Sequence, residues 1–483
     1  MRGGILSDSE RAILWDRDEA MRATGGVGTP AWTAYGVSID TRDLAPGDLF
    51  VALRAQRDGH EFLSTAFARG ASAALVDKSG LREAGIDADH FAPGPLLVVD
   101  DTLAGLEQLG RVARQRSAAL RIGVTGSVGK TSVKEMIATI LAQAGPSHQS
   151  VKSYNNHWGV PLTLARMPAD TRRAVFEMGM NAPGEIRQLV AQVQPHIAMI
   201  TRIAPAHLER LGSIEAIAAA KAEIFTGFAE ADPHCPSTAI IPGDDDFADY
   251  LAQEARSAQR LLRFGLGANC EARLVDYADD GTSGIGRADM LGRMVTFRIQ
   301  AGGTHWGLNA IAAILAAHGA GVDVQMAADS LSTYFEPPAG RGQVFEIALQ
   351  KGGHFTLIDD AYNANPASMA AALAALAKRQ TSGRKWVALG EMRELGEASA
   401  DLHRALSPAI EAAGADGVFL AGGAPMQALW QALPAMNRSA MADHADALIG
   451  VIEDRLEAGD ILLVKGSNAS GMMRIVSHFR GAR

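Results

Sequence analysis

A glycine-rich loop between an apolar run and an amphipathic stretch constrains this chain more than any other feature. Residues 120–124 form a short apolar run, which predicts a buried strand. Residues 133–141 repeat Val, Met, Ile and Leu at the spacing of one helical face, which predicts a helix. The loop between them has the sequence Thr125-Gly126-Ser127-Val128-Gly129-Lys130-Thr131-Ser132. A strand, a glycine-rich loop and a helix in this order are typical of phosphate-binding loops.

The residue types of this loop suit a nucleotide polyphosphate. Glycines allow positive φ and close approach of backbone N–H groups to phosphate oxygens. Lys130 would neutralise the β- and γ-phosphates, and the Thr131 hydroxyl would bind Mg²⁺. The general pattern places its first glycine at the position of Val124, whereas this chain has glycine at 126. The alternative interpretation is a glycine-rich turn that merely joins a strand to a helix.

Bulk properties exclude several classes of protein. A chain of 483 residues predicts about three domains. The net charge is −9, from 45 basic and 54 acidic residues, and no segment concentrates Lys and Arg, so we expect no nucleic-acid partner. Acidic residues in the first 21 positions argue against a targeting peptide, and no apolar run is long enough to span a membrane. Two isolated cysteines fit a reducing cytoplasm and no disulfide framework.

Alternating strand and helix patterns predict an α/β protein with three domains. Residues 1–100 form a small α/β domain with strands at 48–53 and 73–76. Residues 101–335 form a central ATP-binding domain of the phosphate-loop type, with a mostly parallel sheet. Residues 336–483 form a C-terminal Rossmann-like domain, which follows a hinge rich in Pro and Gly at 337–342. Its predicted strands lie at 355–358, 385–389, 417–420 and 461–466.

Several polar residues are candidates whose structural role is equally plausible from sequence. Glu177 ends a predicted strand, where it would reach the Mg²⁺ held by Thr131, but a solvated acid is common there. His207 follows the strand at 197–203, and a lone histidine is more often structural. Lys221 is a surface cation by default. His305 and Asn309 lie four residues apart on one helical face, where helix capping competes with adenine recognition.

Four motifs occur along the chain: Thr-Gly-x-x-Gly-Lys-Thr at 125–131, Tyr-Asn-Asn with Gly-Val-Pro-Leu-Thr within 154–163, Glu-Met-Gly at 177–179, and Asp-Asp-Ala-Tyr-Asn-Ala-Asn-Pro at 359–366. Together they resemble the motifs of the Mur ligase family, the ATP-dependent ligases that build the peptidoglycan precursor peptide. The resemblance covers nearly the whole chain. It implies that the three domains hold the uridine nucleotide, ATP and the incoming amine, in that order along the chain.

Carried over position by position, the resemblance implies roles for particular residues. Catalytic roles fall on Lys130, His207, Lys221 and Arg341. Metal binding falls on Thr131, Glu177, His207 and Lys221. ATP binding falls on Thr125, Gly126, Ser127, Val128, Gly129, Lys130, Thr131, Ser132, His305, Asn309, Arg341 and Asp360. Binding of the other substrates falls on Asp40, Thr41, Arg42, Asn155, Asn156, Asn363 and Asn365.

The resemblance further implies a ligase that joins D-alanyl-D-alanine to UDP-N-acetylmuramoyl-tripeptide, with ATP and Mg²⁺, as a cytoplasmic monomer without a nucleic-acid or membrane partner. In several relatives the lysine matching Lys221 is carbamylated, which would supply an anionic metal ligand. Two departures stand out: Thr41 replaces a serine, and His157-Trp158 replace an acidic or small residue and isoleucine. The third residue of the tripeptide, lysine or meso-diaminopimelate, is left open. One rival interpretation is another ligase of the same superfamily, which adds a single amino acid to a UDP-MurNAc peptide or adds glutamate to folate. The others are a nucleotide-dependent switch or binding module, and a structural partner in cell-wall assembly whose ATP site is vestigial.

Overall fold

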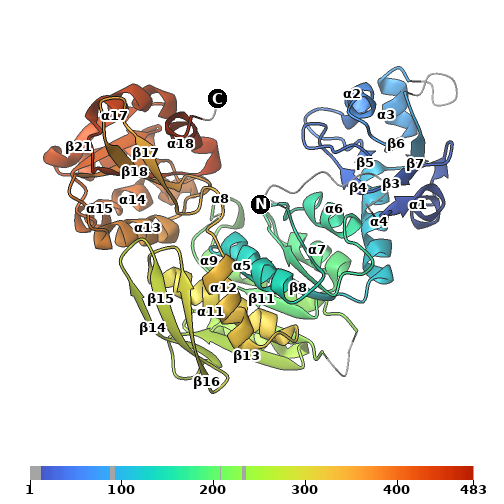
Figure 1. Ribbon diagram of the computed structural model, residues 1–483, viewed down its shortest axis with the longest axis horizontal. Coiled ribbons are helices and arrows are strands. Elements are labelled where there is room, and N and C mark those ends of the chain that lie inside the picture. The colour runs from blue at the N-terminus through green and yellow to red at the C-terminus, as the bar shows by residue number, and fades with distance from the viewer. Residues whose placement is uncertain (1–11, 87–92, 152, 207, 231–234, 482–483) are drawn as a thin grey trace. The chain divides into compact units, whose positions relative to one another are not determined.

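The computed structural model describes residues 12–86, 93–151, 153–206, 208–230 and 235–481 (Figure 1). The chain divides into two compact units. The first comprises Met1–Gly123, Gly145–Met178 and Arg187–Pro195, and the second comprises Val124–Ala144, Gly179–Ile186 and His196–Arg483. Among the described residues, every helix is too short or too polar to cross a bilayer.

A five-stranded sheet with the order β2-β7-β6-β5-β4 forms the beginning of the first unit. Its strands are β2 (Val27–Gly28), β4 (Gly36–Ser38), β5 (Asp48–Val51), β6 (Ala73–Asp77) and β7 (Leu96–Val99). The strands β4 to β7 are parallel, and β2 is antiparallel to β7. The predicted strands at 48–53 and 73–76 are confirmed as β5 and β6, although β5 ends two residues early. Apolar residues of β5 and β6 pack on both faces of the sheet, as continuous apolar strands require.

The rest of the first unit consists of helices and the beginning of the central sheet. Helices α4 (Thr102–Arg116) and α6 (Gly159–Ala165) pack against each other, and Trp15 Nε1 donates to the Ala165 carbonyl at 2.9 Å. Strand β10 lies between β8 and β9, and it is parallel to β9. These strands are β8 (Leu120–Thr125), β9 (Ser147–Gln149) and β10 (Arg173–Glu177). Glu177 therefore lies at the carboxyl end of a buried strand, as predicted.

The second unit continues from the last residues of β8, where Thr201 N–H donates to the Thr125 carbonyl at 2.9 Å. Next along this sheet are β11 (Ile197–Ile200), β12 (Thr238–Pro242), β13 (Arg260–Gly265), β14 (Ala272–Asp279), β15 (Gly284–Met290) and β16 (Arg293–Ile299). β11 to β14 are parallel, whereas β14 to β16 form an antiparallel meander that the sequence analysis did not predict. The central sheet is therefore parallel only up to β14.

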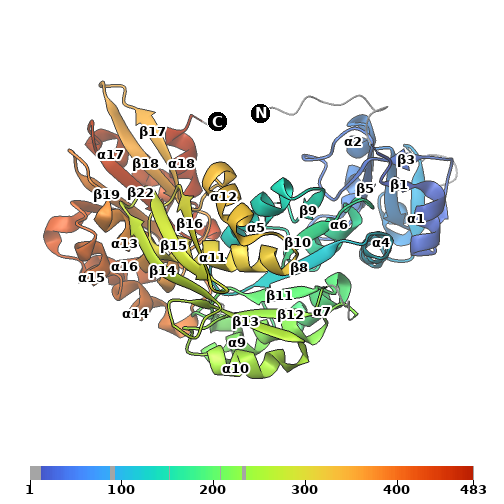
Figure 2. The ribbon, with the colours of Figure 1, turned by 60° about the horizontal axis from the view of Figure 1, so that its bottom comes forward.

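Helices cover both faces of these strands. Helix α5 (Lys130–Gln143) follows the phosphate-binding loop and packs against α11 (Thr304–Gly319) and α12 (Val324–Tyr334). Helices α9 (Ile214–Ala222) and α10 (Ala248–Glu254) lie on the opposite face of β12 and β13 (Figure 2). This layering places the beginnings of α5 and α11 close to the carboxyl ends of the parallel strands, where α/β proteins bind ligands.

A six-stranded sheet with the order β17-β18-β22-β19-β20-β21 forms the end of the second unit. Its strands are β17 (Gln343–Ala348), β18 (His354–Asp360), β19 (Lys385–Gly390), β20 (Gly417–Ala421), β21 (Arg438–Ala442) and β22 (Ile461–Lys465). All neighbours are parallel except β17, an antiparallel edge strand. The four predicted strands are confirmed, and the edge strands β17 and β21 were not predicted. Parallel strands buried on both faces are apolar throughout, whereas edge strands carry polar residues.

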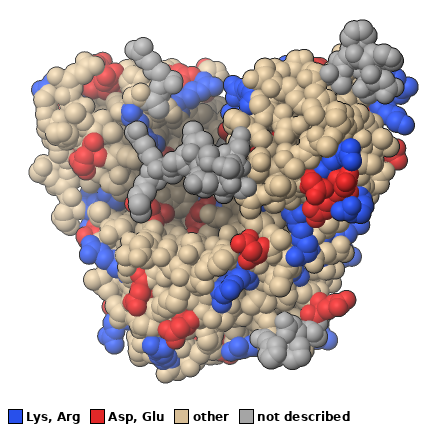
Figure 3. All heavy atoms as spheres, turned by 45° about the vertical axis from the view of Figure 1, so that its right-hand side comes forward, with Lys and Arg blue, Asp and Glu red and all other residues tan. Residues whose placement is uncertain are grey.

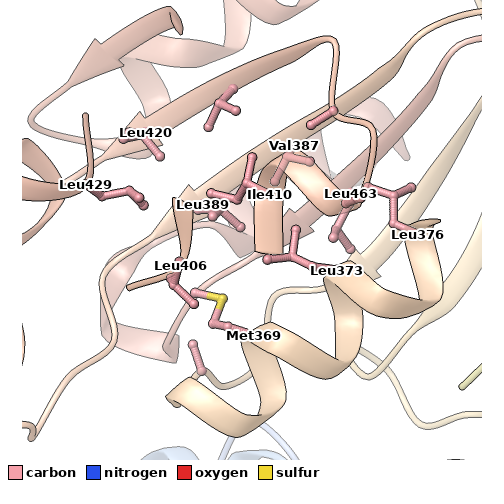
Figure 4. Packing of buried hydrophobic residues seen from close by; sticks show 14 of the residues in the cluster. Met369, Leu373, Leu376, Val387, Leu389, Leu406, Ile410, Leu420, Leu429 and Leu463 are labelled. Carbon is pink, nitrogen blue, oxygen red and sulfur yellow. The ribbon is translucent and has the colours of Figure 1, made fainter. Parts of the chain in front are cut away.

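Helix α13 (Pro366–Lys378) covers one face of this sheet. Figure 4 shows Met369, Leu373 and Leu376 on this helix turned toward Leu389 and Leu463 on the strands. All five side chains are essentially inaccessible to solvent. The helix is thereby fixed on the sheet, and its first residues follow directly from the polar segment at the end of β18.

Candidate active site

The loop between β8 and α5 is closely packed against the end of β11. Gly126 has a φ of +147°, and Gly129, directly before α5, has a φ of +84°. A Cβ at position 126 would lie 2.0 Å from Thr201 Oγ1. The single proton of the Thr201 hydroxyl is shared between the carbonyl oxygens of Thr125 and Val128, so Thr201 fixes the loop to the end of β11. Both glycines are therefore required by geometry.

The interior of this loop has polar groups arranged for an anion. The hydroxyls of Thr125 and Ser127 are buried and have no hydrogen-bond partner among the described residues. Lys130 Nζ lies 2.6 Å from the Gly126 carbonyl oxygen, to which it donates. No described side chain caps the beginning of α5. Two orphaned hydroxyls, an ammonium and the positive end of a helix fit a polyphosphate.

Lys221 lies near the loop lysine and not at the surface. It belongs to α9, its exposed fraction is 1 %, and it interacts electrostatically with Lys130. Burial, together with repulsion by Lys130, holds the pKa of Lys221 well below its ordinary value. The default interpretation of Lys221 as a surface cation is therefore wrong. A buried lysine amine with a depressed pKa is neutral more readily and is reactive as a nucleophile.

The predicted metal ligands fall in different parts of the chain. Thr131 is buried in the first turn of α5, in the second unit. Glu177 is buried at the end of β10, in the first unit, where Asn155 Nδ2 donates to its Oε1 at 2.7 Å. His207 lies outside the described residues. Within the described ranges no three His, Cys, Asp or Glu residues form a metal-binding cluster. Mg²⁺ at nucleotide sites commonly takes only one or two protein ligands beside phosphate oxygens and water.

Helix α11 presents its two predicted residues beside the loop. A Cβ at Gly129 would lie 2.9 Å from Asn309 Oδ1, so this amide lies directly over the loop glycine. His305, one turn earlier, is half-buried. Its surroundings lower its pKa to about 4, first through desolvation and second through repulsion by Lys465. His305 is therefore a neutral imidazole at neutral pH.

Charged groups converge at the carboxyl ends of β18 and β22. Lys465 Nζ lies 2.8 Å from an Asp360 carboxylate oxygen and donates to the Asn363 carbonyl at 3.0 Å. Lys465 is 2 % exposed, so its charge is held by these partners. The Arg341 guanidinium carbon lies 4.8 Å above the Tyr362 ring centre. Arg341 and Asp360, predicted from separate motifs, are thus joined to one segment, residues 359–366.

The two predicted asparagines of this segment have local structural partners. Asn365 is the N-cap of α13, and its side chain and Ser368 form a reciprocal capping box. Asn363 Oδ1 accepts from the Ala364 N–H at 2.9 Å, and its side chain is exposed. In the first unit Asn156 similarly accepts from backbone N–H groups at the beginning of α6. Capping uses these side-chain oxygens and leaves their amide N–H groups as donors.

The predicted nucleotide loop of the first unit is held by arginines. Asp40 accepts from Arg42 Nε at 2.9 Å and from Arg42 Nη2 at 2.6 Å. Arg69 Nη1 donates to the Thr41 carbonyl at 2.8 Å, which fixes the loop from the other side. The Arg42 side chain is 85 % exposed. The loop thus presents an arginine to solvent on a rigid base.

Three residues of these sites were not predicted from the sequence. Lys465 was recognisable only as one polar residue at a strand end. Tyr154 and Arg166 line a cavity of about 190 Å³ beside Asp40, and their position depends on how α6 packs against β4, which sequence spacing does not show. On the face of the molecule shown in Figure 3, acidic and basic side chains are interspersed and not gathered by sign.

Comparison with protein families matches two consecutive segments of the chain. Residues 124–317 match the Mur ligase middle domain, and residues 340–468 match the Mur ligase glutamate ligase domain. The first segment begins at the phosphate-binding loop and includes α11. The second begins beside Arg341 and ends after Lys465.

Known proteins match along almost the full length. The UDP-N-acetylmuramoyl-tripeptide–D-alanyl-D-alanine ligase of Bacillus subtilis is 34 % identical over 452 residues, which cover 92 % of each chain. The enzyme of the same name from Escherichia coli is 34 % identical over 459 residues, covering 92 % of this chain and 93 % of that one. The crystal structure of MurF from Acinetobacter baumannii matches with a TM-score of 0.81 at 27 % identity. The match covers 97 % of this chain and 99 % of that chain. The predicted three-domain α/β fold is thereby confirmed.

Proposed function

The chain belongs to the Mur ligase family, and we propose that it joins D-alanyl-D-alanine to the terminal carboxylate of UDP-N-acetylmuramoyl-tripeptide, with ATP converted to ADP and phosphate. The observation that carries this proposal is similarity over nine-tenths of the chain to ligases that bear the name of this reaction. The product would be the UDP-linked pentapeptide precursor of peptidoglycan.

Amide formation in water requires that the carboxylate first be activated. A carboxylate oxygen of the tripeptide attacks the γ-phosphorus of ATP, the bond from phosphorus to the bridging oxygen breaks, and ADP leaves. The product is an acyl phosphate. The free amine of D-alanyl-D-alanine then attacks the acyl carbon, loses a proton, and expels phosphate to leave the amide. Because an acyl phosphate hydrolyses, the site must exclude water, and we propose closure about the segment 337–342 as the means.

We assign the phosphates of ATP to the loop between β8 and α5. The orphaned hydroxyls of Thr125 and Ser127, the backbone around Gly126 and the Lys130 ammonium provide donors for phosphate oxygens. Arg341 would add a second cation for the transferred phosphoryl group. Positioned charges of this kind supply most of the catalysis in phosphoryl transfer. The remaining loop residues would contribute backbone N–H groups.

His305, Asn309 and Asp360 would hold the nucleoside of ATP. The neutral imidazole of His305 and the Asn309 amide suit an adenine edge, because both offer a donor and an acceptor. Asp360, which is held by Lys465, would accept from ribose hydroxyls. We propose that Asp40, Thr41, Arg42, Asn155 and Asn156 bind the UDP-linked substrate, and that Asn363 and Asn365 bind on the side of the incoming dipeptide.

Mg²⁺ would neutralise the polyphosphate and orient it for in-line transfer. Its protein ligands would be Thr131, Glu177, His207 and a carbamylated Lys221. Two observations support the modification: Lys221 is buried, and its depressed pKa favours the neutral amine that reacts with CO₂. An intact mass about 44 Da above that of the unmodified chain (the mass of the added CO₂), lost in acid and absent from Lys221→Ala, would establish it.

We further propose domains at 1–100, 101–335 and 336–483, and action as a monomer in the cytoplasm. Cys235 and Cys270 are not joined in a disulfide, which suits a reducing compartment. Light scattering on the purified protein tests the oligomeric state.

Phosphate release from ATP and Mg²⁺ tests the proposed reaction directly. The UDP-tripeptide and D-alanyl-D-alanine are supplied separately and then together, with the lysine and the meso-diaminopimelate forms of the tripeptide compared. We expect release only when both are present, and none from Lys130→Met. Release without either substrate would contradict the proposal in favour of a nucleotide-dependent switch. Release with the tripeptide and a single amino acid would indicate another ligase of the family.

A further inference from the structure

The motif at 359–366 begins with Asp359, a residue to which the proposed function gives no role. Its carboxylate is buried near the carboxyl end of β18, with an exposed fraction of 2 %. Oδ2 accepts from the Gly340 N–H at 3.2 Å, and Oδ1 accepts from the Ala361 N–H at 3.3 Å. The Asp359 carbonyl oxygen accepts from the Gly342 N–H at 2.7 Å. Asp359 therefore joins the segment that precedes β17 to the residue that follows β18.

This segment holds the backbone of Arg341 in a tight turn. The Arg341 N–H donates to the Pro338 carbonyl at 3.0 Å, and the Tyr362 N–H donates to the Gly340 carbonyl at 3.1 Å. Gly340 has a φ of +71°, and a Cβ there would lie 2.7 Å from Tyr362 Cβ, so the turn needs glycine at this position. Both neighbours of Arg341 are bonded to the end of β18 or to the residues just after it. Arg341 is therefore carried by the last sheet, although it precedes the strands of that sheet in the chain.

The guanidinium of Arg341 has partners in the same motif. Its carbon lies 4.8 Å from the centre of the Tyr362 ring. It also attracts the Asp360 carboxylate, an oxygen of which lies 2.8 Å from Lys465 Nζ. A ring face and a nearby carboxylate restrict a side chain that is otherwise flexible. Residues 359–362 therefore restrain both the backbone and the charged end of Arg341.

A carboxylate at position 359 fits this arrangement better than an amide. Each of its oxygens accepts from a different backbone N–H, whereas an Asn amide offers one acceptor oxygen and a competing donor. Burial raises the pKa of Asp359, and the nearby Asp360 raises it further, while the two N–H groups and Arg480 act in the opposite direction. Replacing Asp359 by Asn therefore removes one hydrogen bond and leaves the size of the side chain almost unchanged.

We propose that Asp359 is a positioning residue for Arg341, because through the turn it sets where the guanidinium meets the phosphoryl group that is transferred. The inference rests on the proposed function, which gives Arg341 its role. A charge that stabilises a transition state must be placed accurately, since a displacement of about 1 Å can cost about 100-fold in rate. Asp359 thereby acts on kcat, whereas nucleotide affinity comes from the loop between β8 and α5.

A double-mutant cycle on phosphate release, with both organic substrates present, tests this coupling. Asp359→Asn should lower kcat by about 10- to 100-fold and leave the calorimetric affinity for ADP within about threefold of wild type. In a chain that already carries Arg341→Met, the same change should cost less than about twofold, because Asp359 acts only through that side chain. Losses that multiply in the double variant would refute the inference, and so would an Arg341→Met variant with the kcat of wild type.

Asp460→Asn is the matched control. Asp460 is another buried carboxylate of the same sheet, directly before β22, and it accepts from the N–H groups of Arg384 at 2.7 Å and Glu457 at 2.9 Å. Its replacement should lower stability and leave kcat unchanged. A fall in kcat equal to that of Asp359→Asn would show that any damage to this sheet slows the reaction, and would contradict a specific role of Asp359.

Hydrogen exchange of the peptide that covers residues 338–342 needs no ligation. Exchange should rise by about 10-fold or more in Asp359→Asn and stay unchanged in Asp460→Asn, and an unchanged rate in Asp359→Asn would refute the inference whatever the reaction is. If Asp359→Asn does not fold, Tyr362→Leu carries the same cycle, with an expected loss of about 3- to 30-fold in kcat. A wild type that releases phosphate without the two organic substrates would refute the proposed ligation alone. The cycle measured on that release, together with the exchange rates, then decides the role of Asp359.

Discussion

Replacing Gly126 by alanine should disable the phosphate-binding loop by two separable effects. The backbone φ of +147° is unfavourable for a residue with a Cβ, at a cost of about 1–3 kcal/mol. The new Cβ would lie 2.0 Å from Thr201 Oγ1, so Thr201 must rotate away. It would give up the hydrogen bond of its single hydroxyl proton, which is shared between the Val128 carbonyl at 2.5 Å and the Thr125 carbonyl at 3.2 Å and is worth about 1 kcal/mol. Together these costs reach about 2–4 kcal/mol, a loss of about 30- to 700-fold in ATP affinity.

The assay is the KM for ATP together with calorimetric binding of ADP. Gly145→Ala is the matched control, because its φ of +125° imposes similar backbone strain while nothing lies within 4 Å of the added Cβ. It should lower stability and leave nucleotide affinity unchanged. The double variant Gly126→Ala with Thr201→Ala removes the colliding hydroxyl and should bind ADP several-fold better than Gly126→Ala alone. Nucleotide affinity of Gly126→Ala within threefold of wild type would refute the argument, and so would a double variant with no recovery.

Three further predictions concern stability. Burial lowers the pKa of His148 to about 4, so between pH 6.5 and 4 the unfolded chain binds a proton that the folded chain does not. The urea midpoint of unfolding should therefore decrease as the pH is lowered through that window, and it should decrease less in His148→Gln. Lys465→Met leaves the Asp360 carboxylate without its 2.8 Å partner, and thermal unfolding should show a loss of about 3 kcal/mol, partly restored by adding Asp360→Asn; an additive double variant would contradict this. Leu373→Ala empties part of the core in Figure 4 and should cost about 2–4 kcal/mol in urea unfolding, whereas a loss below about 1 kcal/mol would mean that the core collapses around it.

Sequence patterns predicted the parts of this fold that are encoded locally. The phosphate-binding loop and its flanking strand and helix depend on about twenty consecutive residues, and all three lie where the pattern placed them. The buried strands of the last sheet were found because parallel strands are continuously apolar. The meander β14 to β16 was missed because its strands alternate exposed and buried residues without an apolar run.

The sequence predicted several residues of the candidate site, but it did not predict how the fold buries or positions them. Lys221 is buried on α9, whose alanine-rich sequence gives no sign of which face of the helix is covered. Arg166 takes its position from a hydrogen bond to Val37, 129 residues earlier in the chain. Asn365 was predicted to bind substrate, and the structure adds a local role, because its side-chain oxygen caps α13 through Ser368. Non-local packing decides the burial of Lys221 and the position of Arg166, and spacing in one sequence does not contain it.

The interleaved course of the chain through the two units has a consequence for synthesis on the ribosome. The first unit takes residues from three separate stretches, the last of which ends at Pro195. A nascent chain released from the exit tunnel up to Gly123 therefore lacks β9, β10 and α6, and buried residues of α4, such as Leu106 and Leu109, lack the part of their apolar cluster that α6 supplies until that helix is made. Nearly two hundred residues must emerge before the first unit can close. Fragments that end near Gly123 would expose the same surface, so a gene shortened there is expected to yield aggregating protein.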